Sequence, residues 1–291
     1  MRCNLCPRAC RVDRIAKKGF CGAGPLPLVA KAMLHRWEEP CLSGERGSGT
    51  VFFSGCNLGC VFCQNYLLQD GALGRTMDAA ALSDLFLSLQ ARGAHNISLV
   101  TPTPHIPVIR EALIRRKCNG LTLPVVYNTS SYERASALRS LSGLVDIYLP
   151  DLKYVSPVLS ARFSGAADYF SFAAPAIREM YRQVGDLTTD TTGMALKGLM
   201  IRHLVLPCCV DDTRRVLDHI ADAYPLHTHV SLMCQYTPTV NTLKPPLNRR
   251  ITRREYDRAV TYALDLGFTN LLLQQESSAD PSFTPDFTQF Q

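Results

Sequence analysis

The sequence lacks any long hydrophobic run: no apolar stretch approaches the roughly 20 residues that a membrane-spanning helix needs. Arg2 and Cys3 follow the first methionine, and the N-terminal residues show no apolar segment of the kind found in signal peptides. It also contains no known nucleic-acid-binding motif. We therefore expect a cytoplasmic protein that binds neither a membrane nor nucleic acid.

Charged residues are sparse, at 19% of 291 positions, whereas 46% of the positions are hydrophobic. This composition is that of a globular protein, and the length suits one large α/β barrel or two smaller domains. The formal net charge is +6, with the densest basic runs at Arg115–Lys117 and Arg249–Arg250. Such runs are usually solvated faces, but a weakly basic surface also suits an acidic partner, such as an electron-donating flavodoxin or ferredoxin.

Cysteine, in contrast, is abundant: the chain has 12, which in a cytoplasmic protein indicates metal or redox chemistry rather than disulfides. Cys56, Cys60 and Cys63 stand in C-x3-C-x2-C spacing directly after residues 50–54, a run that predicts a buried strand. Three thiolates on one loop can bind three irons of a [4Fe–4S] cube and leave the fourth iron open to a ligand. The alternative, a structural zinc knuckle or buried free thiols, fits a lone triplet poorly.

The first 25 residues hold four further cysteines, Cys3, Cys6, Cys10 and Cys21, among glycines and prolines that favour turns. Four thiolates can close a second metal site, and a segment with few apolar residues needs such a staple. The spacing favours an auxiliary [4Fe–4S] cluster, with a structural zinc as the alternative. Buried free thiols are expected at the remaining positions, Cys41, Cys118, Cys208, Cys209 and Cys234.

From residue 50 onward, predicted strands and amphipathic helices alternate. Apolar residues recur with helical spacing from Leu82 to Leu89, and Thr252–Glu255 form a capping box that opens another helix. This alternation indicates βα units around a parallel sheet, with too few units for a closed eight-stranded barrel. The predicted strands are residues 50–54, 96–101, 123–128, 144–149, 199–206, 229–235 and 268–273.

The cysteine triplet resembles that of the radical SAM superfamily, and other phrases resemble the proteins related to pyruvate formate-lyase activating enzyme. These phrases are Cys6-Pro7-Arg8, Trp37-Glu38-Glu39-Pro40, Cys63-Gln64-Asn65 and residues 148–153 and 202–207. The resemblance covers nearly the whole chain. It implies that the open iron chelates S-adenosylmethionine, whose reductive cleavage gives a 5′-deoxyadenosyl radical that abstracts a hydrogen atom.

The same resemblance implies an α/β fold, the radical SAM partial (β/α)6 TIM-like barrel, over residues 50–275. A Cys-rich cap and connector precedes it at residues 1–49, and a polar tail follows at residues 276–291, expected to lie loosely on the surface. Residues 155–197 form an insert that we expect over the barrel mouth, where specificity often resides. Trp37, the one tryptophan, is expected to pack between cap and barrel.

Side chains at the carboxyl ends of the predicted strands are the candidate site, as in other parallel barrels. By resemblance, Lys153 and Arg202 bind the carboxylate of S-adenosylmethionine, and Asp151 holds a cation or the sugar. Asp151 and Lys153 share a face of an extended chain, and alternation sends His203 away from Arg202. A surface ion pair is the alternative for the first two. His105 is either a polar substrate contact or simply exposed.

Weaker candidates flank this set. The Gly-Gly-Glu segment that holds the methionine amino group in many radical SAM proteins is missing, so carbonyls or hydroxyls around Thr101 and Thr103 would serve. Asn128 and Thr129 resemble the stretch that binds a monovalent cation in the activases, with an ordinary helix cap by the following serines as the alternative. Gln235 is a candidate contact for the adenine.

The resemblance makes a glycine of a glycyl radical enzyme the first candidate substrate. One alternative is radical modification of another peptide or of a small molecule. A second alternative is a non-catalytic iron–sulfur or zinc protein that serves electron transfer or scaffolding. Asp151, Lys153 and Arg202 argue against this second alternative, because an electron carrier needs no groups that bind a cofactor carboxylate.

Overall fold

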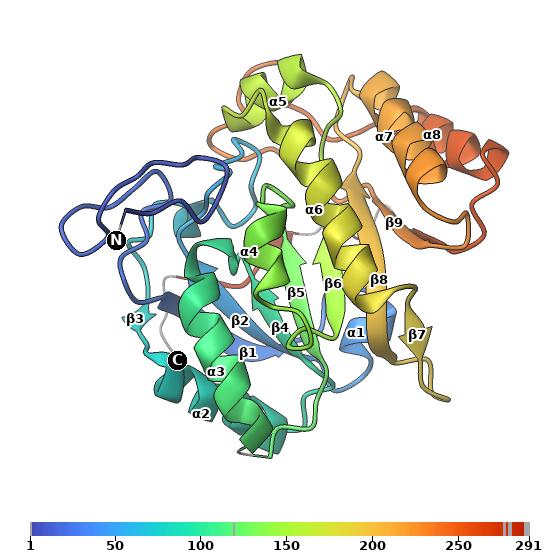
Figure 1. The fold of residues 1–291 in the computed structure, drawn as a ribbon. Coiled ribbons are helices and arrows are strands. Elements are labelled where there is room, and N and C mark those ends of the chain that lie inside the picture. Colours follow the sequence, from blue (N-terminus) through green and yellow to red (C-terminus); the bar gives the residue numbers. More distant parts are fainter. Residues whose placement is uncertain (1, 119, 276–277, 279–280, 288–291) are drawn as a thin grey trace.

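The computed structural model describes residues 2–118, 120–275, 278 and 281–287. Its centre is a ten-stranded sheet that stays open, with β10 at one edge and β3 at the other (Figure 1). All seven strands predicted from the sequence are present and run parallel, so the predicted partial barrel is confirmed. In order across the sheet they are β2 (Ser48–Ser54), β4 (Ile97–Val100), β5 (Val125–Thr129), β6 (Ile147–Pro150), β8 (Ala195–Leu204), β9 (His229–Met233) and β10 (Leu271–Leu273).

Three further strands were not predicted. β1 (Leu28–His35) lies antiparallel to β2, and β3 (Arg75–Thr76) lies antiparallel to β1, so the sheet extends beyond the cysteine-bearing strand. β7 (Thr188–Thr189) pairs with the start of β8. Leucine, alanine, methionine and lysine favour helix as much as strand, and only the pairing with β2 decides the conformation of β1.

One face of the sheet carries most of the helices (Figure 1). They are α2 (Ala79–Ala91), α3 (Ile106–Cys118), α4 (Ala135–Arg139), α6 (Tyr169–Val184), α7 (Val210–Ala223) and α8 (Arg253–Asp265). The predicted apolar stripe of α2 is fully buried at Leu82, Phe86 and Leu89, and the predicted capping box of α8 is formed by Thr252 and Glu255. Throughout the described residues, no helix combines the length and the hydropathy needed to cross a bilayer.

The opposite face of the sheet forms the barrel interior, and α1 (Pro40–Ser43) plugs one end of it. Leu42 packs there against Val126, Leu149 and Met200. The carbonyl of Leu42 accepts a 2.7 Å hydrogen bond from Asn96, directly before β4, which places the plug at the amino ends of the strands. Polar groups inside the barrel are therefore left near the carboxyl ends.

The insert and the tail complete the fold. α5 (Pro157–Ser164) lies beside the loop after β2, and α6 packs against β6 and β8 as an ordinary crossover helix. Short 3₁₀ turns occur at Tyr66–Leu68, Thr103–His105 and Pro281–Phe283.

The expectation of a loose tail was wrong in the described part, because Phe287 is buried edge-on against Phe52. Phe283 stacks on Trp37, with ring centroids 4.0 Å apart. Trp37 therefore contacts the tail, and 58% of it remains exposed, rather than being packed between cap and barrel.

Candidate metal and cofactor site

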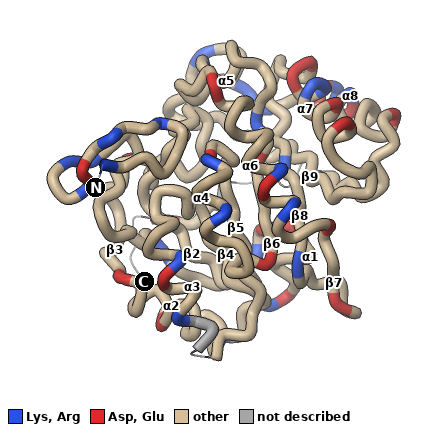
Figure 2. The backbone as a smooth tube through the Cα atoms, viewed as in Figure 1, with Lys and Arg blue, Asp and Glu red and all other residues tan. Residues whose placement is uncertain are grey.

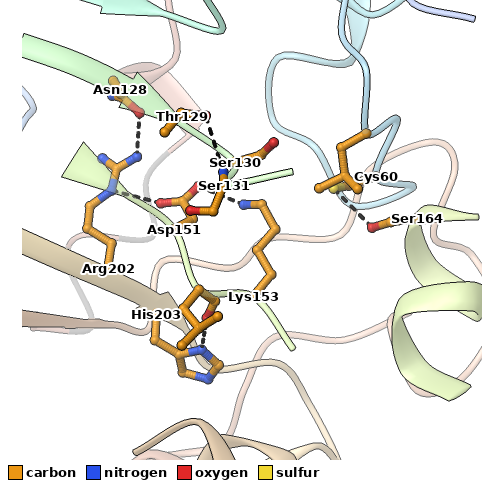
Figure 3. Close-up of polar contacts among 12 residues, drawn as sticks. Cys60, Asn128, Thr129, Ser130, Ser131, Asp151, Lys153, Ser164, Arg202 and His203 are labelled. Atoms are coloured by element: carbon orange, nitrogen blue, oxygen red, sulfur yellow. Dashed lines mark hydrogen bonds and ion pairs between the residues drawn. The ribbon is translucent and has the colours of Figure 1, made fainter. Parts of the chain in front are cut away.

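The first part of the site is the cysteine loop, residues 55–63, which leaves the carboxyl end of β2. Gly55 begins it with a φ of +98°, and a Cβ at this position would lie 2.7 Å from the carbonyl oxygen of Cys21. Only glycine fits there without displacing the chain. Cys60 is buried, and its Sγ accepts a 3.1 Å hydrogen bond from the hydroxyl of Ser164 at the end of α5 (Figure 3).

The three loop thiols lie within electrostatic reach of one another. Burial and, to a smaller extent, neighbouring thiols of the triplet raise the pKa of Cys60 to about 11 and that of Cys63 to about 12. The ammonium group of Lys153 acts in the opposite direction on both thiols. Without a metal, the thiols of Cys60 and Cys63 keep their protons at neutral pH, and a bound metal would displace those protons. Three thiols and one cation therefore share a small space.

Among the described residues, no three Cys, His, Asp or Glu side chains converge closely enough to hold a single metal ion. That criterion describes a site such as zinc, where all ligands surround one atom. A [4Fe–4S] cube is larger and takes each thiolate on a different iron. The loop supplies the soft thiol donors that such a cluster binds.

The second part of the site is a buried ion cluster centred on the guanidinium of Arg202, in β8 (Figure 3). Its Nε donates to Asp151 at 2.8 Å, its Nη1 to Glu38 at 3.2 Å and its Nη2 to Asn128 at 2.7 Å. Lys153 Nζ donates to the other oxygen of Asp151 at 2.7 Å. The structure thus brings together Asp151, Lys153 and Arg202, which we call the clamp, and adds Asn128 from β5.

Charges in this cluster are unequal in number. Burial acts to raise the pKa of Asp151, but Arg202 and Lys153 outweigh it and hold that pKa below its ordinary value. Burial raises the pKa of Glu38 and of Glu39, an effect that Arg202 opposes. Three carboxyl groups therefore share two cations, and burial favours the protonated forms of Glu38 and Glu39 unless further positive charge is close by.

Sequence analysis missed the role of Glu38 and Glu39, which it treated only as part of a resembling phrase. Glu38 Oε1 accepts from Asn128 while Oε2 accepts from Arg202. Glu39 Oε2 is buried without a hydrogen bond, 3.9 Å from Arg202 Nη1. No local signal marks them, because two adjacent carboxylates before a proline are ordinary in an exposed loop.

Thr103 and Thr129 do not reach this cluster. Their hydroxyls donate to Oε1 of Glu133, at 2.7 and 2.6 Å, and Tyr127 donates to the same oxygen at 3.0 Å. Glu133 is fully buried, and burial raises its pKa. Thr129 follows Asn128 in β5, so strand alternation turns the two side chains to opposite faces.

Among the other candidates, Gln235 and His105 have partners outside the cluster. Thr101 adopts a left-handed φ of +60°, and Gln235 accepts a 2.8 Å hydrogen bond from Gln274. His105 was expected to be exposed or to contact substrate, but it is buried, with Nε2 3.0 Å from the carbonyl of Ser54. Burial lowers its pKa to about 4, so it is neutral. His203 packs against α7, where its Nε2 lies 2.9 Å from the hydroxyl of Thr213.

The N-terminal cysteines form a separate group. Backbone turns hold them, with the amide of Arg11 donating to Cys3 at 2.9 Å and that of Ala9 to Cys6 at 3.1 Å. Burial and, to a smaller extent, Cys21 and Cys3 raise the pKa of Cys6 to about 11. Burial also raises the pKa of Cys21, as do Cys3 and Cys10. Each of the four thiols therefore lies within electrostatic reach of at least one other, although the segment contributes no strand to the sheet.

The remaining cysteines follow the expectation in part. Cys209 and Cys234 are buried and Cys41 is half-buried. Cys208 is exposed, contrary to the prediction, and Arg249 Nη2 lies 3.2 Å from its Sγ. The turn after β8 gives Cys208 a left-handed φ of +60°, which directs its side chain away from the core that holds Cys209. The side chain of Cys118 lies outside the described part of the chain.

The sequence matches no protein-family model. It is 29% identical over 281 residues to an uncharacterized protein, MJ0674, of Methanocaldococcus jannaschii, covering 91% of this chain and 76% of that protein. SuiB of Streptococcus suis, crystallised with S-adenosylmethionine, superposes with a TM-score of 0.53 at 14% identity, over 80% of this chain and 52% of SuiB. Methylornithine synthase (PylB) superposes with a TM-score of 0.51 at 15% identity, over 75% of this chain and 60% of PylB.

The chain has the radical SAM barrel fold. It spans only half to three-fifths of the length of these two structures. SuiB also superposes, with a TM-score of 0.52, in its complex with the precursor peptide SuiA. In this chain, the cysteine loop follows the carboxyl end of β2, and Asp151 and Arg202 lie at the carboxyl ends of β6 and β8, so the loop and the clamp are at the same end of the barrel.

Proposed function

We propose that this chain is a radical SAM enzyme in which Cys56, Cys60 and Cys63 hold a [4Fe–4S] cluster. The observation that carries the proposal is the position of Lys153, which lies between the loop thiols and the buried Asp151–Arg202 pair. Bound there, a reduced cluster and S-adenosylmethionine would supply a 5′-deoxyadenosyl radical that abstracts a hydrogen atom. The complex of SuiB with S-adenosylmethionine, on the same fold, supports this cofactor.

The clamp binds the carboxylate of S-adenosylmethionine in this proposal. Arg202 keeps its charge at every physiological pH, and the carboxylate of Asp151 raises the pKa of Lys153 above its ordinary value despite burial. A ligand carboxylate would compete with Asp151 for these two cations. Glu38 and Asn128 hold the other nitrogens of Arg202, so the plane of the guanidinium is fixed before the ligand arrives.

The surplus of carboxyl groups supports the same ligand. S-adenosylmethionine carries an ammonium and a sulfonium against one carboxylate, so its net charge is positive. The clamp with Glu38 and Glu39 has three carboxyl groups and two cations, all buried to a similar extent. A ligand with one excess positive charge would favour the ionised form of these carboxyl groups and balance their charge.

Aromatic side chains around the cysteine loop have the task of excluding water. The ring of Phe62 lies edge-on to Tyr154, Phe163 and Tyr236, with centroids 6.3 to 6.5 Å apart. Lys153 Nζ lies 5.9 Å from the centroid of Phe62. A dry, apolar wall protects a reactive radical from solvent and strengthens the electrostatic contacts of the clamp.

Cys3, Cys6, Cys10 and Cys21 are proposed to bind a second metal centre. Their spacing favours a [4Fe–4S] cluster, and zinc is the alternative. The closeness of the four thiols supports a shared ligand. A monovalent cation is not part of the proposal, because Asn128 and Thr129 already bind protein partners.

The electron donor is proposed to be an acidic flavodoxin or ferredoxin. Residues 2–21 carry six basic side chains and one acidic one, Asp13. Figure 2 shows basic residues along this N-terminal segment, while elsewhere in that view the two signs are interspersed. Opposite charge would steer the donor to the side of the protein that holds both cysteine groups.

The proposed substrate is a peptide or protein, with a glycine of a glycyl radical enzyme as the specific candidate. The complex of SuiB with the precursor peptide SuiA supports a peptide on this fold. A small molecule is the second candidate substrate, because methylornithine synthase has the same fold.

The test is anaerobic reconstitution with iron and sulfide, reduction, addition of S-adenosylmethionine and measurement of 5′-deoxyadenosine. The wild type is compared with a Cys56→Ala, Cys60→Ala, Cys63→Ala variant and with Cys208→Ala, an exposed cysteine outside both groups. Product from the wild type and Cys208→Ala, but not from the triple variant, is expected. A cluster that is fully loaded yet shows no spectral response to S-adenosylmethionine would favour the electron-transfer alternative.

A further inference from the structure

We propose that Arg8 is a positioning residue that couples the metal centre of the N-terminal cysteines to the geometry of the cysteine loop. The inference rests on the proposed function and deepens it, because it assigns the N-terminal centre a task. Arg8 stands two residues after Cys6, and its guanidinium reaches the loop that carries the other three thiols.

The guanidinium makes four hydrogen bonds, all to backbone carbonyls. Nε donates to Asn57 at 2.9 Å, and Nη2 donates to Leu58 at 2.9 Å. Nη1 donates to Gly165 at 2.6 Å, and Nη2 also donates to Ser164 at 2.9 Å. A fork of fixed geometry that spans two chain segments holds them at a defined separation.

Both of these segments control the position of Cys60. Asn57 and Leu58 lie between the first two thiols of the loop, so their carbonyls set the path of the chain from Cys56 to Cys60. Ser164 is bonded to Cys60 through its own hydroxyl, at 3.1 Å. Arg8 therefore fixes the loop on one side of this thiol and its hydrogen-bond donor on the other.

The N-terminal segment in turn fixes Arg8. The ring of Phe20, the neighbour of Cys21, stacks on the guanidinium at 3.8 Å, and the ring of Tyr132 lies 5.3 Å away. A Cβ at Gly59 of the loop would lie 3.3 Å from Phe20. Such contacts add cation–π attraction to the hydrogen bonds and leave Arg8 little freedom.

A metal is what would keep this arrangement together. Residues 2–27, all of them described, contain no helix or strand. A segment of this kind loses its ordered conformation unless a cross-link offsets the chain entropy. A metal on the four thiols would hold Cys6 and Cys21 in place, and with them Arg8 and Phe20. Loss of the metal would therefore release the carbonyls of the cysteine loop.

The test is a double-mutant cycle on reconstituted protein. One change is Arg8→Gln, the other replaces Cys3, Cys6, Cys10 and Cys21 by serine, and the control is Arg11→Gln, an exposed arginine of the same segment. The readouts are the electron paramagnetic resonance spectrum of the reduced loop cluster, its change with S-adenosylmethionine and the rate of iron loss to a chelator. Metal at the N-terminal thiols is counted separately in a Cys56→Ala, Cys60→Ala, Cys63→Ala background.

We expect Arg8→Gln to alter the spectrum and to speed iron loss from the loop about tenfold, since a charged group with four partners is lost. The serine variant should produce the same spectrum, and the combination should add nothing further. Arg8→Lys should recover only part of the effect, because an ammonium cannot reproduce the planar fork. Arg11→Gln should match the wild type.

Independent, additive effects of the two changes would overturn the coupling, as would an Arg8→Gln spectrum identical to that of Arg11→Gln. If Arg8→Gln does not fold, Arg8→Lys in the same cycle decides the question. A triple variant that retains no metal would refute the N-terminal centre of the proposed function, and with it the metal dependence. If Arg8→Gln still altered the spectrum of the loop cluster in that case, Arg8 would position the cysteine loop without help from a metal at the N-terminal thiols.

Discussion

Cys56, Cys60 and Cys63 follow a strand in which every residue from Ser48 to Ser54 is buried, and neighbouring strands pair with it on both sides. Cys3, Cys6, Cys10 and Cys21 belong to a segment held by turns and by contacts such as those of Arg8. The sheet therefore positions the loop thiols whether or not they bind metal. The N-terminal thiols depend on one another, so their ligand has a larger share in their local fold.

The largest expected effect is on chemistry alone. Cys60→Ala should lower formation of 5′-deoxyadenosine by at least about a thousandfold, since the cofactor carries the reaction. The melting temperature should change by only a few degrees, because β2 remains fully paired. A variant that keeps a tenth of the wild-type rate would contradict the proposed cluster site, and Cys208→Ala serves as the control.

The second largest effect is expected on stability, from the removal of Arg202, the central cation of the ion cluster. Arg202→Ala leaves Asp151 and Glu38 without their shared partner, and breaking such a buried pair costs about 3–5 kcal/mol of unfolding free energy. Urea denaturation of the metal-free protein measures this cost. Arg202→Lys should recover part of the stability but bind S-adenosylmethionine more weakly than the wild type. Equal stability of all three proteins would show that the ion cluster is not formed in solution.

The third expected effect is a pH dependence of the free energy of unfolding, caused by two buried histidines in the barrel. Burial lowers the pKa of His105 and of His203 from 6.5 to about 4. Between pH 6.5 and about pH 4, the unfolded chain binds more protons than the folded protein does. The free energy of unfolding therefore falls as the pH decreases through this range. Each histidine should account for about 2 kcal/mol of unfolding free energy between pH 7 and pH 5.

His105→Gln tests this link, because its ring contacts the carbonyl of Ser54 directly before the cysteine loop. The variant should show a smaller loss of unfolding free energy over the same interval than the wild type. The N-terminal segment, residues 2–21, has no histidine, so protease sensitivity within it should not follow the same pH curve. An unchanged slope for His105→Gln would mean that this side chain is open to solvent.

The smallest expected effect on the fold lies in the N-terminal segment, residues 2–21. Replacing Cys3, Cys6, Cys10 and Cys21 by serine should raise the rate of tryptic cleavage at the exposed Lys17 and Lys18 about tenfold. The circular dichroism of the barrel should not change. If the variant and the metal-loaded wild type were cleaved at equal rates, the N-terminal segment would not depend on a metal for its local fold, and the difference between the two cysteine groups would not hold.

Much of the fold could be predicted from sequence because the parallel strands are short apolar runs separated by periodic helices. β1 was not predicted because Leu28–His35 is rich in residues that favour helix. The strands that pair with it, β2 and β3, lie later in the chain. Local propensity carries no information on such pairing.

The site could be predicted where neighbours along one strand decide it, as for Asp151 and Lys153. Glu38 could not be placed, because it reaches Arg202 only through the plug of α1 at the far end of the barrel. Thr103 and Thr129 were assigned by resemblance, and the buried Glu133 that binds their hydroxyls is distant from Thr103 in sequence. Tertiary contacts of this kind have no signature in spacing alone.

The contact between Phe287 and Phe52 links the described part of the tail to the strand that precedes the loop thiols. Phe52 lies four residues before Cys56, and the ring of Phe287 packs edge-on against it. Both belong to a buried apolar cluster with Ala30, Leu68 and Val100. Removing Phe287 would therefore uncover β2 beside the cysteine loop, so the tail has a share in shielding that strand from water.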